Sequence, residues 1–243
     1  LLVWFWMTSF SEIEGYKGYK ELYPEAPTTF EYVEDVSSSP LVDFDANLLH
    51  ADLREIKDSL MEKAKEMGVQ YFVVPGSTLE DSTQVLEFCK ERGSEIVATA
   101  GVHPYHVMEE ACNDDSLEKL RLLTENEKCH AVGECGLDYS EGFPAPELQA
   151  NWFRKQVDLA LEVNKPLFLH ERNAHSDFLS ALDAAGFSPD GSQKNPVECI
   201  VHCFTGNINE LECYVKRGFY IGLTGYVMNR LQPEELMEWM KII

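Results

Sequence analysis

The stretch that decides the fold runs over residues 131–202 and contains Ala-Val-Gly-Glu at 131–134, Leu-Phe-Leu-His at 167–170 and Ile-Val-His at 200–202. Each of these runs is short and apolar, as a buried strand is, and each ends in one ionisable residue. Between the first two runs, apolar residues recur at helical spacing over residues 148–161, which predicts an amphipathic helix. The stretch therefore predicts strands that alternate with helices.

The same alternation extends outward from this stretch in both directions. Strands and helices that alternate at this spacing are typical of a parallel sheet, either open or closed as a (β/α)₈ barrel. Neither a GxGxxG nor a GxxxxGK[ST] motif follows the first run, so the sequence lacks the signature of a nucleotide-binding open sheet and favours the barrel. The predicted strands are Leu41–Phe44, Tyr71–Val74, Ile96–Ala100, Ala131–Val132, Leu167–Leu169, Cys199–Val201 and Phe219–Ile221.

The pattern changes at Leu41. Residues 8–40 carry scattered Gly, Pro, Ser and Thr without a sustained period. We therefore expect two parts, an N-terminal extension or linker over residues 1–40 and a barrel over residues 41–243.

Composition narrows the classes of function. The chain has 243 residues with 42 acidic and 20 basic side chains, a formal net charge of −22, and 44% hydrophobic residues. This apolar content is enough for a core and excludes a disordered acidic protein. The charge argues against a broad basic face that holds nucleic acid, because Lys and Arg contacts to phosphate supply most of that affinity.

The cysteines and the apolar segments indicate the compartment. The seven cysteines are an odd number without CxxC spacing, which favours reduced thiols inside the cell. The apolar run over residues 1–7 is far shorter than the ~20 residues of a membrane span. We expect a cytoplasmic protein without a membrane partner. The nucleus is left open as a second compartment, and the sequence identifies no protein partner.

Four predicted strands deliver an ionisable residue at their carboxyl ends: His103, Glu134, His170 and His202. In a barrel these ends meet at one rim, where the chemistry lies. Imidazole and carboxylate together suit Mg²⁺, Mn²⁺ or Zn²⁺, so we expect one or two divalent ions and a water molecule activated by them. Glu134 is the only candidate among the four to bridge two ions.

Three further residues near this rim have two interpretations each. Cys135 and Cys203 adjoin expected ligands, but neither has a base partner in the sequence, and packing as small residues is the simpler role. Arg172 could clamp a phosphate by its planar fork of donors or could pair with a nearby acid.

Four motifs occur in order along the chain: Gly101–Pro104, Gly133–Asp138, His170–His175 and His202–Gly206. They closely resemble those of the TatD family of metal-dependent deoxyribonucleases. The resemblance runs from about Leu41 to the last residue and implies a (β/α)₈ barrel that hydrolyses DNA with divalent metal, trimming strands from the 3′ end. It also implies that Glu134, His170 and His202 bind metal, with Glu134 between two ions, and that His103 is catalytic on the substrate side.

The first departure from the family pattern lies after the first strand. Asp45-Ala46-Asn47 stands where many members carry His-x-His. Asp45 is a competent ligand for a hard cation, so we expect it in the metal site. We expect Asn47, with His103 and Arg172, to contact substrate.

The second departure lies at the end of the chain. Family members continue past the segment that matches Trp239–Ile243 into an eighth strand, whose Asp serves as ligand and catalytic base. We expect seven strands here, with the eighth strand and last helix missing. A barrel without its last strand leaves an open seam, so we expect a fragment that is weakly stable and poorly active.

Three functions follow from these observations. The first is hydrolysis of DNA phosphodiester bonds by metal-activated water, as a 3′–5′ exonuclease. The second keeps the metal and changes the bond to an ester, such as that of D-aminoacyl-tRNA. The third is a non-catalytic, degenerate barrel that serves as a scaffold or binds DNA ends.

Overall fold

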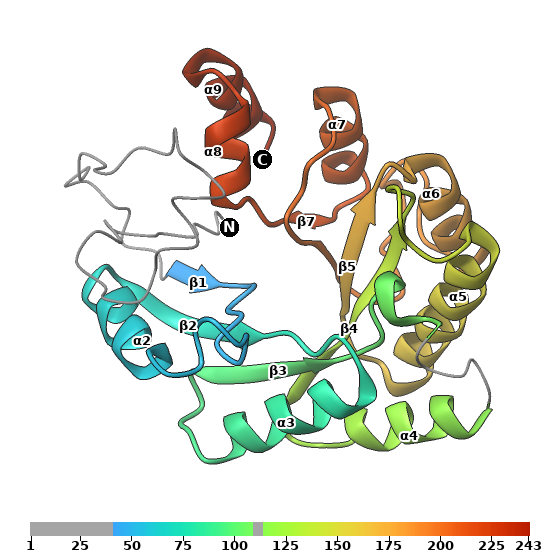
Figure 1. Ribbon diagram of the computed structural model, residues 1–243. Coiled ribbons are helices and arrows are strands. Elements are labelled where there is room, and N and C mark those ends of the chain that lie inside the picture. Colours follow the sequence, from blue (N-terminus) through green and yellow to red (C-terminus); the bar gives the residue numbers. More distant parts are fainter. Residues whose placement is uncertain (1–40, 109–113) are drawn as a thin grey trace.

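The structure is a computed structural model that describes residues 41–108 and 114–243. The predicted extension over residues 1–40 lies outside the described residues. Within the described part, strands and helices alternate along the chain, and the strands form one curled parallel sheet with helices on its outer side (Figure 1).

The sheet contains all seven predicted strands in chain order, each paired in parallel with the next. This confirms the α/β class and the barrel-like curl expected from the sequence. The described sheet runs from β1 at one edge to β7 at the other. Its strands are β1 (Leu41–Asp43), β2 (Val69–Val74), β3 (Ile96–Ala100), β4 (Cys129–Asp138), β5 (Leu167–Arg172), β6 (Cys199–Val201) and β7 (Tyr220–Ile221).

The central strands are apolar on both faces because helices cover one face and the inside of the curl takes the other. Leu167, Phe168 and Leu169 of β5 are all fully buried. Leu167 pairs with Cys199 and Leu169 with Val201. Burial on both faces explains why parallel strands appear in the sequence as continuous apolar runs.

Helices follow the strands around the outside of the curl. The predicted apolar stripe lies on α5, where Trp152, Phe153 and Val157 are buried, whereas Leu148 in the first turn is 39% exposed. Helix α5 ends at Asn164, which has φ 52°. The helices are α2 (Lys57–Glu66), α3 (Leu79–Lys90), the 3₁₀ turn η2 (Pro104–His106), α4 (Asp114–Thr124), α5 (Pro146–Val163), α6 (His175–Ala184), α7 (Ile208–Lys216), α8 (Gly225–Arg230) and α9 (Pro233–Ile242).

Strand β4 differs most from the expectation. The prediction ended it before Glu134, but the strand continues to Asp138 because its pairing with β5 resumes at Cys135 after a register shift. Glu134 therefore lies inside β4, at the irregularity, and not after its end. The glycines of this segment hide the strand from a pattern search, since glycine is depleted in strands.

Two other findings complete the fold. The cysteines within the described ranges are free thiols, four of them buried. Within the same ranges, no helix has both the length and the apolar character that crossing a membrane requires.

Candidate metal centre

The loop after β2 fixes two of the ionisable residues through the main chain. The amide of Glu134 donates to the carbonyl of Gly76, and the amide of His103 donates to the carbonyl of Ser77, each at 2.9 Å. Both carbonyls belong to the residues that follow β2. One loop therefore sets the positions of a residue of β4 and a residue after β3.

His202 is fixed from its backbone and from its ring. Its amide donates to the carbonyl of Leu169 at 3.0 Å, which places it directly after β6 and beside the end of β5. Its ring stacks on the ring of Phe168, with centroids 4.5 Å apart and planes 15° from parallel. His202 is buried, so its ring nitrogens have little access to water.

Glycine at position 136 brings β4 close to β5. Gly136 has φ +151°, and a Cβ atom there would overlap the carbonyl oxygen of His170. Any larger residue would push the two strands apart. The glycine therefore allows Glu134 and His170 to approach each other across the sheet.

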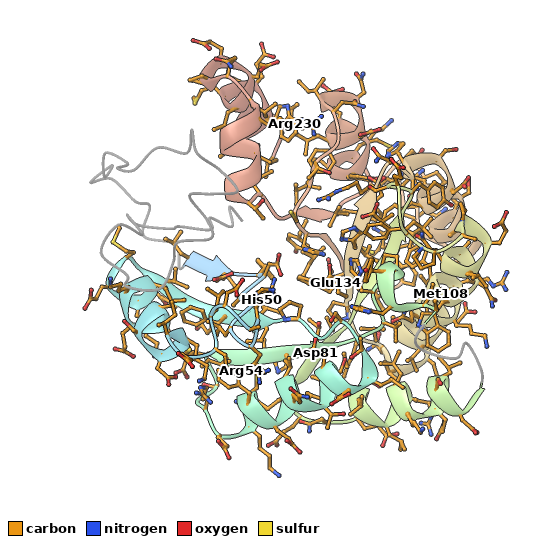
Figure 2. The ribbon with its side chains drawn as sticks, in the orientation of Figure 1. His50, Arg54, Asp81, Met108, Glu134 and Arg230 are labelled. Carbon is orange, nitrogen blue, oxygen red and sulfur yellow. The ribbon has the colours of Figure 1, made fainter. Side chains whose placement is uncertain are left out.

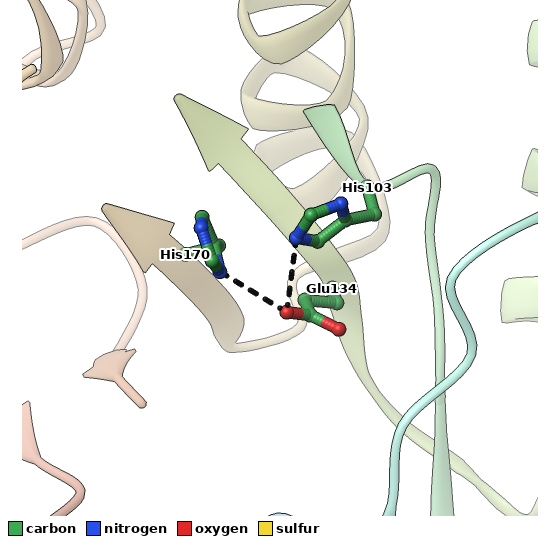
Figure 3. A group of neighbouring side chains, drawn as sticks. All are labelled: His103, Glu134 and His170. Atoms are coloured by element: carbon green, nitrogen blue, oxygen red, sulfur yellow. Dashed lines mark ion pairs between the residues drawn. The ribbon is translucent and has the colours of Figure 1, made fainter. Parts of the chain in front are cut away.

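One carboxylate oxygen lies at the meeting point of three imidazole rings. Oε1 of Glu134 is 2.8 Å from Nε2 of His202, 3.2 Å from Nδ1 of His170 and 3.4 Å from Nε2 of His103. Figure 3 shows the approach of His103 and His170 to this oxygen. In Figure 2, Glu134 lies on the inner side of the curled sheet. The four ionisable residues predicted to share one rim are thus brought together.

The nitrogen of each ring that points away from Glu134 faces a different group. Nδ1 of His103 accepts the backbone N–H of Tyr105 at 3.0 Å. Nε2 of His170 lies 3.0 Å from Oδ2 of Asp138, a fully buried carboxylate that can only accept from it when ionised. Nδ1 of His202 lies 3.4 Å from Oδ2 of Asp45.

These partners set where each neutral ring carries its proton. The lone pair on Nδ1 of His103 is occupied by the Tyr105 amide, so the proton of the neutral ring is on Nε2 and points toward Glu134. In His170 the proton is on Nε2 and points toward Asp138, which leaves the lone pair of Nδ1 facing Glu134. His170 is therefore prepared to be a ligand, whereas His103 is prepared to donate a hydrogen bond.

The pKa values follow the same division. Burial lowers the pKa of His103 to about 4, so this ring is neutral at pH 7. Burial also opposes the charged forms of His170 and His202, but the adjacent carboxylates outweigh it and raise the pKa of both rings. Burial disfavours ionisation of Glu134 as well, yet the neighbouring rings hold its pKa well below the usual range. The centre thus combines an ionised carboxylate with two imidazole rings whose surroundings favour a bound positive charge.

The residues present fit a divalent cation. Nδ1 and Nε2 of His202 are buried without a hydrogen-bond partner among the described residues. A buried polar atom without a partner is costly, and a cation would satisfy it. His103, Glu134 and His170 each offer a donor atom within 4.8 Å of the others. Nitrogen and oxygen donors without thiolate match Mg²⁺, Mn²⁺ or Zn²⁺.

The residues after β1 lie beside this centre. Asp45 faces His202, and Nδ2 of Asn47 donates to Oδ1 of Asp45 at 3.2 Å. Arg172 is the last residue of β5, two positions after His170, so it lies on the same face of that strand. The expected substrate contacts of Asn47 and Arg172 stay predictions.

The two cysteines at the rim are packed in different ways. Cys135 is fully buried, and burial raises the pKa of its thiol, which disfavours a nucleophile. Sγ of Cys203 lies 3.5 Å from Oγ1 of Thr224.

Asp138 is a residue of the site that was not predicted from the sequence. It lies at the end of the motif Gly133–Asp138, where no role was expected for it. One signal was available, because Glu134, Gly136 and Asp138 alternate as residues on one face of a strand do. The signal was hidden because Glu134 was expected to end the strand.

The chain matches the model of a known protein family. The family model described as "TatD related DNase" matches residues 42–243, which is most of the chain. The chain belongs to the TatD family. The resemblance found in the motifs is therefore confirmed, and the match begins where the predicted barrel begins.

Two curated relatives of this TatD-family chain carry the same name. The protein named "3′-5′ ssDNA/RNA exonuclease TatD" from Erwinia tasmaniensis is 34% identical over 203 residues, which cover 84% of this chain and 75% of that protein. The protein of the same name from Shigella flexneri is 32% identical over 204 residues, covering 84% of this chain and 74% of that protein.

Solved structures of the TatD family share the fold. A TatD family hydrolase from Entamoeba histolytica superimposes with a TM-score of 0.71 and 28% identity, covering 85% of this chain and 71% of that one. A TatD homologue from Escherichia coli gives a TM-score of 0.66 and 28% identity, covering 76% of this chain and 68% of that one.

Proposed function

We propose that this TatD-family chain is a metal-dependent exonuclease that removes nucleotides from the 3′ end of single-stranded DNA or RNA, and that residues 41–243 act as its catalytic unit. The observation that carries the proposal is the convergence of His103, His170 and His202 within 3.4 Å of one oxygen of Glu134. The activity is that of the relatives named above, whose length the chain covers to about three quarters.

We assign His170 as a ligand from the direction of its Nδ1 lone pair, and His202 from its buried ring nitrogens without a hydrogen-bond partner among the described residues. Glu134, His170 and His202 would hold a divalent cation, and Asp45 would support a second cation beside His202. A bound divalent cation lowers the pKa of water and stabilises negative charge on a phosphoryl oxygen. Asp138 holds the ring of His170 with its Nδ1 lone pair directed into the centre.

His103 would act on the substrate and not on the ion. As a ligand at Nε2 it would have to shift its proton to Nδ1 and break the hydrogen bond from the Tyr105 amide. Its Nε2 instead lies 3.4 Å from Oε1 of Glu134 in this structure, and in the complex its N–H would donate to a phosphate oxygen. Arg172 and Asn47, at the same rim, would contact phosphate and sugar.

The test uses single-stranded oligonucleotides labelled at the 5′ end. We expect products that shorten from the 3′ end, no cleavage in EDTA, and recovery with Mg²⁺ or Mn²⁺. Cleavage that is undiminished in EDTA, or that starts at the 5′ end, would contradict the proposal. A parallel assay on D-aminoacyl-tRNA would reveal the ester-hydrolase alternative, in which the ester is cleaved and the oligonucleotide is not.

A further inference from the structure

Two aromatic side chains stand beside the candidate centre without a role in it. Tyr105 lies on η2, immediately after Pro104, and is 49% exposed. Phe143 lies in the loop between β4 and α5 and is half-buried. Their ring centroids are 5.3 Å apart with an interplanar angle of 75°, an edge-to-face pair.

This pair lies next to His103, the ring that would contact the substrate. The ring of Phe143 lies 6.3 Å from the ring of His103, centroid to centroid. The backbone amide of Tyr105 is the donor that fixes Nδ1 of His103. The aromatic pair therefore borders His103, whose Nε2 lies 3.4 Å from Oε1 of Glu134.

A second exposed apolar side chain follows Tyr105 closely in the sequence. Met108 follows Tyr105 by three residues and is 66% exposed (Figure 2). A single exposed apolar side chain is ordinary, but neighbouring exposed aromatic and thioether groups next to a candidate centre indicate a binding surface.

The net charge of the chain favours contacts with nucleobases over contacts with phosphates at this surface. A chain with net charge −22 gains little from contacts between Lys or Arg and a phosphate backbone. Stacking between an aromatic ring and a nucleobase needs no charge, and it contributes about 1–3 kcal/mol for each base in any sequence. An enzyme that removes successive nucleotides needs such sequence-tolerant contacts.

We propose that Tyr105 and Phe143 form a stacking site for the nucleobase next to the phosphate that reacts at the centre. The occupant is an unpaired base of single-stranded nucleic acid, whose faces are free to stack. This inference rests on the proposed exonuclease function and adds the subsite that positions the terminal nucleotide.

The first experiment measures stacking by fluorescence, in EDTA so that cleavage does not interfere. Oligonucleotides carry 2-aminopurine at the 3′ end, where stacking on a protein ring changes its emission. We expect the Tyr105→Ala and Phe143→Ala variants to bind about 10-fold more weakly and to lose the emission change, and Tyr105→Phe to keep both. Tyr71→Ala is the matched control. Tyr71 is 46% exposed and lies in β2, three residues before the carboxyl end of that strand.

The second experiment measures hydrolysis with a 3′-terminal abasic nucleotide. The wild-type protein should show a KM about 10-fold higher for the abasic oligonucleotide than for the intact one. Tyr105→Ala should show the higher KM for both substrates, because removing the base and removing the tyrosine ring abolish the same stacking contact.

The outcomes separate this inference from the proposed function. The stacking site would be overturned if the wild type and Tyr105→Ala showed equal emission changes. It would also be overturned if Tyr105→Ala raised the KM by the same factor for the intact and the abasic oligonucleotide. Absence of any nucleotide release by the wild type would overturn the exonuclease function, while the fluorescence experiment would still decide the stacking site.

Discussion

His103 and His170 face the same carboxylate oxygen with opposite proton placements. A backbone N–H holds Nδ1 of His103, and a carboxylate holds Nε2 of His170. The two rings are chemically identical, but the group bound to the other nitrogen of each ring differs. This difference makes His103 a hydrogen-bond donor and His170 a ligand.

Replacing His103 with alanine tests this division. We expect kcat on a single-stranded oligonucleotide to fall about 10²–10³-fold, because a positioned hydrogen-bond donor is lost. Affinity for Mn²⁺ should stay within about 3-fold of the wild type, since no ligand is removed. His170→Ala is the comparison, and it should lose Mn²⁺ affinity. Equal losses of Mn²⁺ affinity in both variants would show that His103 is a ligand.

Replacing Asp138 with asparagine tests the orienting role of this carboxylate. The amide cannot hold the His170 proton as strongly, so we expect Mn²⁺ affinity to fall about 10–100-fold without loss of folding. ¹⁵N spectra of the ring should show a mixture of tautomers in the variant and one tautomer in the wild type. Asp177→Asn is the control, because Asp177 accepts a hydrogen bond from Tyr139 instead of a centre histidine. Unchanged affinity and an unchanged tautomer would exclude the role.

Strands β4 and β5 form the element on which the centre depends, and glycine at their contact makes it possible. Gly136→Ala combines a strained φ with a clash against the carbonyl of His170. We expect the free energy of unfolding to fall by about 2–5 kcal/mol, measured by urea denaturation. Gly142 has φ +90° with open space around it, so Gly142→Ala isolates the strain and should cost about 1–2 kcal/mol. Equal losses in the two variants would mean that close approach of the strands does not matter.

The sequence predicted the elements better than the contacts between them. All seven strands are present. The central strand β5 is buried on both faces and appears as a continuous apolar run, whereas β1 and β7 at the edges are less buried and have shorter runs. The extension of β4 through Gly136 to Asp138 was missed, since strand propensity is weak at glycine and pairing with β5 decides the outcome.

The site shows the same limit. The strand-end pattern predicted that His103, Glu134, His170 and His202 meet, because parallel strands align their carboxyl ends. The proton positions could not be predicted, since they depend on a backbone amide and on a carboxylate that only the folded chain brings to the rings.

The charge of the whole molecule should destabilise it at low salt. With a net charge of −22, acidic side chains repel one another across the surface. Raising NaCl from about 0.01 M to about 0.5 M screens this repulsion, and we expect the free energy of unfolding to rise on the order of 1 kcal/mol, or about 3 °C in Tm. Scanning fluorimetry at several salt concentrations measures this. A Tm that falls steadily with NaCl would show that attractive ion pairs dominate instead.

The central claim is that the residues around Oε1 of Glu134 hold a divalent cation, and binding of Mn²⁺ followed by electron paramagnetic resonance tests it most directly. The titration is done in about 0.5 M KCl, which screens weak binding to the acidic surface. We predict a saturable Mn²⁺ site in the wild type and in the surface control Glu141→Gln, and its loss in Glu134→Gln. Saturable binding of equal affinity in Glu134→Gln would contradict the account.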